Sequence, residues 1–494
     1  MSLNKTINME NAILNLHPRR IWHYFDEICQ IPRPSKKEEK IISYLVEFGR
    51  KHGLETIVDD IGNVLIRKPA IPGKEHLKTV VLQNHIDMVC EKNSDVKHDF
   101  EKDAIQPRVE GEWVKATGTT LGADNGIGVA AVLAILENRE IIHGPLECLF
   151  TVDEETGLTG AFGLKEDFLR GRILLNLDSE DEGEIFIGCA GGKDTSILLA
   201  VTWDPVPSGL EALSIEVSGL SGGHSGDDIH KGRGNSNKIL NRVLWMLSQK
   251  FEVRIASFTG GNLRNAIARE AQAEVVISPS DKTAFDSVLK SLSADIRNEL
   301  QHTDAGLEIR TQPIDLPAKV LSRDSTNTLL NALYACPHGV ISMSPVIPGL
   351  VETSTNLASV RTNPDHILIT TSQRSSIESA KVDIANMVGN TFRLAGAKVE
   401  HGNGYPGWTP NPHSEILEIT RKAYVKLFGK EPAVKAIHAG LECGLIGEKY
   451  PGIDMVSFGP TIRGAHSPDE RIEISTVQKF WDHLLEILRT IPSA

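Results

Sequence analysis

The 494-residue sequence has few cysteines and no long apolar run. Its six cysteines are scattered without a Cys-x-x-Cys spacing, and several lie in apolar stretches. This is typical of reduced, buried thiols and argues against disulfides or a cysteine-bound zinc. No stretch is long enough to cross a bilayer, and the first twenty residues lack a cationic segment followed by an apolar one. We therefore expect a cytoplasmic protein without a membrane segment.

Long runs of Lys or Arg are also missing, and the net charge is −13. An acidic chain of this kind is not expected to bind nucleic acid or an anionic membrane. The phosphate-loop pattern Gly-x-x-x-x-Gly-Lys-Ser/Thr is absent too, which argues against nucleotide binding. A small molecule is the expected substrate.

The chain is too long for one ordinary core, so more than one domain is expected. Over the first 190 residues, apolar runs alternate with helical patterns, which favours an α/β fold with a mixed, mostly parallel sheet and helices on both faces. The expected helices are 35–52, beginning with a capping box at Ser35 and Glu38, and 126–137. The expected strands are 63–67, 79–84, 146–152 and 172–177.

The pattern changes after about residue 190. Leu213, Ile215 and Val217 alternate with polar residues, which predicts strands with one buried face and hence an antiparallel sheet. Helices at 237–250 and 375–395 are expected to cover one face of that sheet. From about 400 the α/β pattern returns. We predict a discontinuous α/β domain, 1–189 with 399–494, and an inserted α+β domain, 190–398.

Acidic side chains and a histidine follow three of the predicted strands of the first domain. They are His85, Asp87, Glu154, Glu155 and Asp178. Because the carboxyl ends of parallel strands share one edge of a sheet, these side chains are expected to meet where α/β enzymes hold their ligands. Neighbouring carboxylates repel one another, so a bound cation is the expected reason for gathering them.

The pair His85 and Asp87, and two further candidate ligands, Asp124 and His466, also have plainer interpretations. The two-residue spacing of His85 and Asp87 points both side chains the same way, so Asp87 could orient a metal-binding His85, yet such a pair is often only a loop feature. Asp124 lies in a glycine-rich turn before a helix and could be an N-cap or a carboxylate that bridges two cations. His466 lies in a turn, where a surface histidine is the alternative.

The pair Glu154 and Glu155 is more informative, because it ends a strongly apolar strand. A solvated acidic turn is the alternative. One carboxylate could bind a metal while its neighbour takes a proton from a water that the metal acidifies.

In this order, the motifs resemble those of the bacterial aminoacyl-histidine dipeptidases, members of the two-metal M20-type metallopeptidases. The resemblance covers almost the whole chain. It rests on His85–Asp87, Gly122–Gly126, Asp153–Gly157, Asn176–Ser179, Ser221–Gly226, Tyr405–Trp408, Ile437–Gly444 and Gly464–Glu470.

The resemblance implies a dinuclear metal centre, with zinc expected and manganese or cobalt as alternatives. His85 and Asp178 would bind one ion, Glu155 and His466 the other, and Asp124 both. Glu154 would be the general base acting on a bridging water, and Asp87 would orient His85. The family also has a cis peptide after the bridging aspartate, here between Asp124 and Asn125.

The inserted domain resembles the family's lid and dimerisation domain. The resemblance implies that His224 stabilises the oxyanion, that Asn265 contacts substrate and that Arg374 receives a C-terminal carboxylate. The alternatives are a turn histidine, a polar turn residue and a surface arginine before a helix. Gly440 is expected to shape the pocket.

Contact of His438 or Glu442 with substrate stays open. The expected function is hydrolysis of dipeptides, Xaa-His above all, by a homodimer that joins through the inserted domain. Other activities of the family (tripeptidase, carboxypeptidase or N-acyl amino acid hydrolase) and a non-catalytic peptide-binding role are the alternatives.

Overall fold

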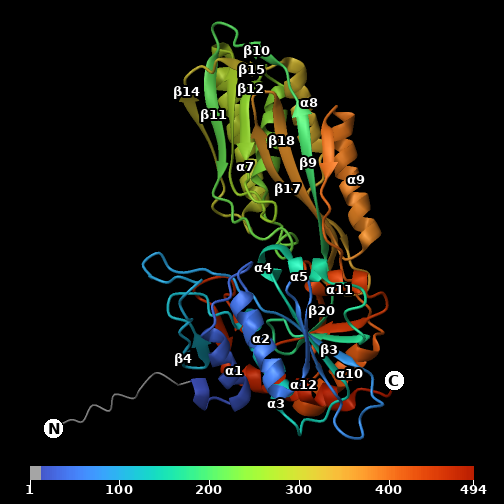
Figure 1. Cartoon of the computed structure of the whole chain (residues 1–494). Coiled ribbons are helices and arrows are strands. Elements are labelled where there is room, and N and C mark those ends of the chain that lie inside the picture. Colours follow the sequence, from blue (N-terminus) through green and yellow to red (C-terminus); the bar gives the residue numbers. More distant parts are fainter. Residues whose placement is uncertain (1–12) are drawn as a thin grey trace, which may run out of the picture. The chain divides into compact units, whose positions relative to one another are not determined.

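The structure is a computed structural model that describes residues 13–494. The chain divides into two compact units, and each is described by itself (Figure 1). Of the described residues, the first unit comprises 13–188, Pro410–Ala436 and Leu441–Ala494, and the second comprises Cys189–Thr409 and Ile437–Gly440. The prediction about a leader segment falls largely on residues 1–12, which lie outside the described residues.

An eight-stranded mixed sheet forms the centre of the first unit. Its strand order is β1 (Glu55–Val58), β2 (Val64–Lys68), β6 (Leu146–Thr151), β3 (Val80–His85), β7 (Ile173–Asn176), β21 (Asp454–Ser457), β8 (Glu184–Cys189) and β20 (Ala433–Ile437). The four central strands β6, β3, β7 and β21 pair in parallel, whereas β1, β2 and β8 pair antiparallel. The predicted fold class is confirmed.

Helices pack on this sheet, and a small second sheet lies in the same unit. The helices are α1 (Arg19–Cys29), α2 (Glu39–His52), α3 (Ala123–Glu137), α4 (Glu154–Gly157), α5 (Thr159–Gly163), α10 (Glu415–Phe428), α11 (Glu442–Lys449) and α12 (Ile474–Thr490). The small sheet has the order β22 (Ile462–Arg463), β23 (Arg471–Glu473), β5 (Trp113–Lys115) and β4 (Arg108–Glu110). In this sheet β23, from the C-terminal part of the chain, pairs with β5, which precedes α3 in the sequence.

Helix α3 is buried on nearly all sides, which explains its continuous run of apolar residues. It begins at Ala123, three residues before the predicted start, so its first turn contains Asp124. The peptide bond between Asp124 and Asn125 is cis.

The predicted capping box before α2 is wrong. The helix begins at Glu39, and neither Ser35 nor Glu38 caps it with a side chain. Ser35 Oγ instead donates to Asp87 Oδ2 at 2.7 Å, and Glu38 Oε1 accepts the backbone N–H of Asp153 at 2.9 Å. Both side chains are therefore used at the strand ends and not at the helix.

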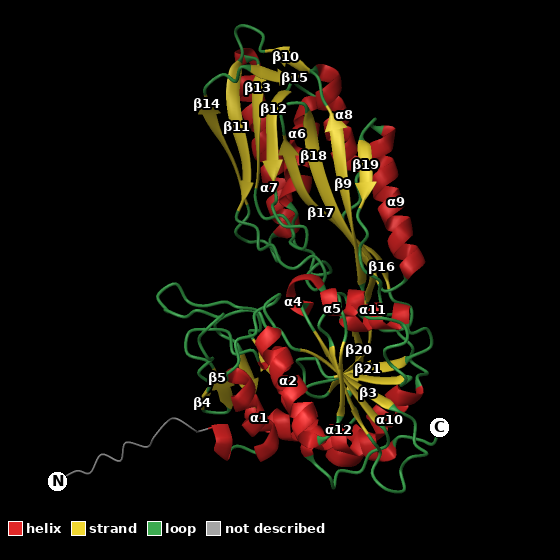
Figure 2. Cartoon of the chain, in the orientation of Figure 1, coloured by secondary structure: helices red, strands yellow, loops and turns green. Residues whose placement is uncertain are grey.

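The second unit contains a nine-stranded antiparallel sheet with four helices (Figure 2). The sheet order is β14 (Glu308–Ile314), β11 (Glu211–Ser218), β13 (Ala271–Ile277), β12 (Arg254–Gly260), β17 (Val351–Thr362), β18 (His366–Ser375), β9 (Gly191–Ala200) and β19 (Lys398–His401), with β16 (Gly339–Met343) also paired to β17. The helices are α6 (Ser236–Ser248), α7 (Lys282–Leu300), α8 (Arg323–Ala335) and α9 (Glu378–Leu394).

One core joins these helices to the sheet. The alternating Leu213, Ile215 and Val217 of β11 pack in the same cluster as Leu240 of α6 and Val388 of α9. The expectation of one-sided strands covered by helices is confirmed, although α7 and α8 were not predicted. The predicted helix at 375–395 begins too early, because β18 continues to Ser375.

Residues 399–409 belong with the second unit, beyond the expected boundary at 398. Their strand β19 pairs antiparallel with β9, and Tyr405 and Trp408 form isolated bridges with Gly192 and Cys189. Among the described residues, no helix has the length and apolar character that crossing a membrane requires.

Candidate metal centre and active site

The predicted residues of the first unit meet at the carboxyl ends of its parallel strands. His85 is the last residue of β3, and the register places it opposite Thr151, the last residue of β6. Asn176, the last residue of β7, pairs with Gln83 of β3. The strands therefore end nearly level, and the residues that follow them share one edge.

His85 uses both ring nitrogens at this edge. Its Nε2 lies 2.9 Å from Asp124 Oδ1 and 3.2 Å from Asp178 Oδ1, and its Nδ1 lies 3.3 Å from Asp87 Oδ1. Burial would lower the pKa of His85, but Asp178, Asp124 and Asp87 raise it more, and the net shift is well upward. Three carboxylates thus converge on one imidazole ring.

His466 approaches the same centre from the loop between β22 and β23. Its Nε2 lies 3.0 Å from Glu155 Oε2 and 3.4 Å from Asp124 Oδ2. Hydrogen bonds with Asp124 and Glu155 raise the pKa of His466 to about 11. The two oxygens of Asp124 therefore face two different histidines, Oδ1 toward His85 and Oδ2 toward His466.

This arrangement can hold a divalent metal ion. Ligand atoms of His85, Asp124 and Glu155 lie within 4.8 Å of one another. Within residues 13–494, no Lys or Arg pairs with Asp124, Glu155 or Asp178. Glu155 Oε1 is buried without a hydrogen-bond partner in the described part of the chain. Buried carboxylates with imidazoles and no fixed cation are the ligands that metals of the zinc type prefer.

Asp87 ties His85 to the acidic turn after β6. It is fully buried, and its carboxylate accepts the backbone N–H of Glu154 at 3.0 Å and of Glu155 at 3.2 Å, together with the Ser35 hydroxyl. Its Oδ1 lies 3.3 Å from His85 Nδ1 while Nε2 faces the other acids, so Asp87 is placed to orient the ring. Asp87 is not part of the cluster of ligand atoms of His85, Asp124 and Glu155.

Glu154 lies in the turn but makes none of the contacts that join the other acids. No described residue donates a hydrogen bond to its carboxylate, and it is not part of the cluster around Asp124. Burial raises the pKa of Glu154 well above its ordinary value, and Asp178, Glu442 and Glu155 add to the rise. A half-buried carboxyl with a raised pKa and no donor in the described residues is suited to proton transfer.

Glu470 supports the loop that contains Asp124, and no sequence pattern indicated a role for it. It is 2% exposed, and its two oxygens accept the backbone N–H groups of residues 121, 122 and 123 at 2.7–2.9 Å and of Asp124 at 3.3 Å. Glu470 follows His466 in the same loop. It therefore joins the loop of one predicted ligand to the loop of another.

Arg33 makes a second connection that the sequence did not indicate. Its guanidinium is buried and donates to the backbone oxygens of Gly122 at 2.6 Å, Asp87 at 2.8 Å and Ile86 at 3.1 Å. Asn125 also holds a ligand, because its Nδ2 donates to Asp178 Oδ1 and to Leu177 O. Side chains that bind backbone groups leave no characteristic spacing in a sequence.

The second unit brings His224 and Arg374 together. Arg374 Nη2 lies 3.5 Å from His224 Nε2, and Arg374 Nη1 donates to the hydroxyl of Tyr405 at 2.9 Å. His224 Nδ1 also lies 3.2 Å from Asp227 Oδ2. Arg374 is 7% exposed and ends a central strand, so the alternative of a surface arginine is wrong. In the described residues no carboxylate pairs with it.

Asn265 and Gly440 lie near this group. The backbone oxygen of Asn265 accepts the N–H of Ser225, next to His224, at 2.8 Å. A Cβ at Gly440 would lie 2.9 Å from Cε2 of Tyr405, so the tyrosine ring occupies the space beside the glycine. Tyr405 lies in one of the motifs, but no pattern in the sequence indicates its contact with Arg374.

The side chain of His438 contacts another residue of the same unit, Ser354. Its Nε2 lies 2.7 Å from Ser354 Oγ, and burial, with Arg374 nearby, lowers the pKa of His438 to about 3. It is therefore a neutral, buried ring.

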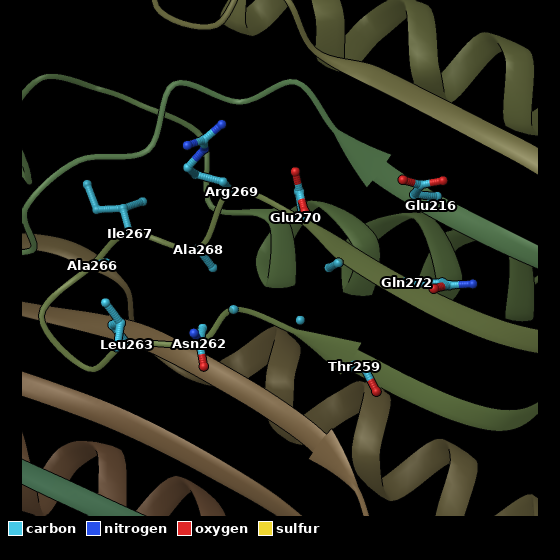
Figure 3. Close-up of a pocket in the computed structure, with 13 residues that line it drawn as sticks. Glu216, Thr259, Asn262, Leu263, Ala266, Ile267, Ala268, Arg269, Glu270 and Gln272 are labelled. Carbon is cyan, nitrogen blue, oxygen red and sulfur yellow. The ribbon is translucent and has the colours of Figure 1, made fainter. Parts of the chain in front are cut away.

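The Asn265 loop also borders a cavity of about 610 Å³ within the second unit (Figure 3). Its polar lining includes Glu216, Asn262, Arg269 and Gln272. None of the predicted metal ligands lines it.

Comparisons with known proteins agree with the resemblance of the motifs. The sequence profile of the peptidase family M20/M25/M40 matches residues 81–490. The cytosol non-specific dipeptidase of Escherichia coli (strain K12) is 45% identical over 483 residues, which is 98% of this chain and 100% of that protein.

Two solved structures are also similar to this chain. The aminoacylhistidine dipeptidase of Vibrio alginolyticus superposes with a TM-score of 0.91 and 46% identity over 98% of both chains. The aminopeptidase PepT of Bacillus cereus, with a TM-score of 0.56 and 18% identity over 96% of this chain and 99% of its own, shares the fold alone. The family profile, which matches more than half of the chain, and the full-length relative establish that this chain belongs to the peptidase family M20/M25/M40.

Proposed function

We propose that the chain is a dinuclear metal-dependent dipeptidase that hydrolyses Xaa-His dipeptides. The observation that carries the proposal is the Asp124 carboxylate, whose two oxygens face His85 and His466. Glu154 precedes Glu155 in the same turn, and no described residue donates a hydrogen bond to its carboxylate. The names of the relatives from E. coli and V. alginolyticus support a dipeptidase, and the second supports histidine at the C-terminal position.

In this proposal His85 and Asp178 would hold one ion, Glu155 and His466 would hold the other, and Asp124 would contribute to both. Zinc suits this carboxylate and imidazole set, and manganese or cobalt can use the same ligands. A bound pair of this kind acidifies water and polarises a carbonyl group.

Proton transfer belongs to Glu154. Its carboxylate takes a proton from the attacking water and passes it to the departing amine. Asp87 orients His85 and holds the backbone of Glu154 in place through the N–H that it accepts. Neither step requires a nucleophilic side chain of the protein.

Residues of the second unit supply substrate contacts in this proposal. His224 stabilises the oxyanion, Arg374 receives the C-terminal carboxylate, and Asn265 and Gly440 contact substrate. The Arg374 guanidinium is buried and has no carboxylate partner among residues 13–494, which supports this role, since such a fork suits an anion.

A peptide panel tests the specificity. With added Zn²⁺, Mn²⁺ or Co²⁺, we expect dipeptides with a free amino terminus to be cleaved, and Xaa-His to give the highest kcat/KM. Tripeptides and N-acyl amino acids are expected to react at least about tenfold more slowly, as when a site loses one charged contact of about 1.4 kcal/mol. Chelator-treated enzyme is the control.

Other results of the panel identify the alternatives. Faster cleavage of tripeptides or N-acyl amino acids would assign a different activity of the family. Equal rates for all dipeptides would keep the dipeptidase and reject the histidine preference. Peptide binding without cleavage under any metal would favour a binding protein.

We also propose a cytoplasmic homodimer that joins through the second unit. The E. coli relative is named a cytosolic enzyme, which supports the location. In the part of the chain that the structure describes, strand β16 pairs with β17 alone, and it exposes Val340, Ile341 and Met343. It is therefore an apolar edge strand without a charge. Antiparallel pairing of two such edges would make one continuous sheet.

Light scattering after size exclusion tests the dimer. We expect a mass twice the 54.0 kDa of the chain for the wild type. Ile341→Lys is expected to give monomers, because a charge on an edge opposes pairing. Lys319→Glu, an exposed change on another strand of the second unit, serves as the control. A monomeric wild type would contradict the proposal.

A further inference from the structure

Glu442, the first residue of α11, is a buried acid with unusual partners. Its side chain is 1% exposed, and within the described residues no Lys or Arg pairs with it. Its Oε2 accepts two hydrogen bonds, from Gln83 Nε2 at 2.6 Å and from Thr151 Oγ1 at 2.6 Å. Its Oε1 is buried with no partner in the described chain.

The Gln83 amide continues into a chain of buried side chains. Its Oε1 accepts from Asn176 Nδ2 at 2.5 Å, and Asn176 Oδ1 accepts from the Ser457 hydroxyl. Ser179 Oγ lies 2.6 Å from Ser457 Oγ. An amide has a fixed donor end and acceptor end, so an acceptor at Glu442 sets the orientation of every group after it.

This chain lies directly beneath the predicted metal ligands. Gln83 is two residues before His85 on β3, and Asn176 is two residues before Asp178 after β7. Thr151 lies opposite His85 in the register of β6 and β3. The chain thus crosses the strands that carry His85 and Asp178, whose closest atoms are 3.2 Å apart.

We propose that Glu442 is a positioning residue that fixes the spacing of His85 and Asp178 through the Gln83–Asn176 chain. The inference rests on the proposed function, because its consequence is the geometry of the ion that these two ligands hold. Burial raises the pKa of Glu442 to about 7, yet a carboxyl group can accept both bonds on one oxygen in either protonation state. The role is therefore one of shape and polarity and does not require a particular charge.

Two substitutions separate the acceptor from the charge. Glu442→Gln keeps a carbonyl oxygen that can accept both bonds, whereas Glu442→Leu removes the acceptor. The visible absorption spectrum of Co²⁺-loaded enzyme reports ligand geometry independently of turnover, and Co²⁺ titration gives the affinity. Both are measured beside kcat and KM for an Xaa-His dipeptide.

For Glu442→Leu we expect an altered Co²⁺ spectrum and a loss of about 10–100-fold in Co²⁺ affinity or kcat, with KM within about twofold, as for residues that orient metal ligands. Glu442→Gln is expected to recover the wild-type spectrum and most of the activity. Thr151→Val removes one donor with little change of shape and is expected to alter the spectrum in the same direction. This variant tests the inference should the leucine variant fail to fold.

Glu147 provides a matched control in the same sheet. It is 2% exposed and accepts from Arg67 and from the backbone N–H groups of Arg170 and Gly171, but it lies near the start of β6, away from the ligands. Glu147→Leu is expected to lower thermal stability while the Co²⁺ spectrum stays as in the wild type.

The inference is overturned if Glu442→Leu, or Thr151→Val where the former does not fold, keeps the wild-type spectrum and Co²⁺ affinity. Equal damage in Glu442→Gln and Glu442→Leu would also overturn it, because the acceptor would then not be what matters. A wild type that binds no Co²⁺ and cleaves no dipeptide would overturn the proposed function itself, and this inference with it. A defect that appears in the variants but not in the wild type leaves the proposed function in place and bears only on the role of Glu442.

Discussion

Replacement of Glu154 by glutamine is expected to lower kcat by about a thousandfold, within the range seen when a general acid or base is removed. The metal content should stay at the wild-type level, because Glu154 is not part of the cluster formed by His85, Asp124 and Glu155. Steady-state kinetics and elemental analysis of the same preparation measure both quantities. Near-normal kcat would remove Glu154 from its role.

The pH dependence gives a second measure of the same residue. A general base must be ionised, so wild-type kcat/KM is expected to fall as pH falls through the pKa of Glu154. Burial raises this pKa, so the fall should begin at a higher pH than for an exposed glutamate. The residual activity of Glu154→Gln should lack this fall. Glu166→Gln, at an exposed position, should match the wild type.

Asp124→Asn is expected to abolish activity for a different reason, namely loss of the ions. An asparagine offers one neutral oxygen where Asp124 directs two carboxylate oxygens toward His85 and His466. We expect the metal content to fall from about two ions per chain to below about one, and kcat to fall by about a thousandfold or more. Elemental analysis and kinetics again provide the measurements.

Thermal denaturation distinguishes loss of metal from loss of fold. Added Zn²⁺ should raise the Tm of the wild type, since a ligand that binds the folded state stabilises it, but should leave the Tm of Asp124→Asn unchanged. Asp60→Asn, at an exposed ion pair with Lys165, should respond to Zn²⁺ as the wild type does. An Asp124→Asn variant that retains two ions would contradict the bridging role.

The sequence predicted the parallel centre of the first unit and the meeting of its acids, because both follow from short-range patterns. A strand that is buried on both faces is apolar throughout, and the residue after it lies at the sheet edge. His85, Glu155 and Asp178 could therefore be placed from three separate segments. His466 could be placed only through the resemblance, because nothing in its turn indicates that β23 pairs with β5.

What the sequence did not reveal depends on contacts between distant segments. Glu470 and Arg33 act on backbone groups, and any loop presents such groups, so no residue pattern marks their partners. The capping box at Ser35 failed for a related reason. The sequence suggested that the Ser35 hydroxyl would accept a backbone N–H at the start of the helix. In the folded chain it instead donates to the buried carboxylate of Asp87, which is distant in sequence.

The hold of Glu470 on residues 121–124 has a consequence for biosynthesis. Residues 466 and 470 are translated long after residue 124, which both of them contact. A nascent chain from which only the earlier strands of the first unit have emerged therefore carries crowded acids without this support. We expect uptake of metal ions to wait for residues 466–470, and a chain truncated before residue 466 to be unable to acquire them.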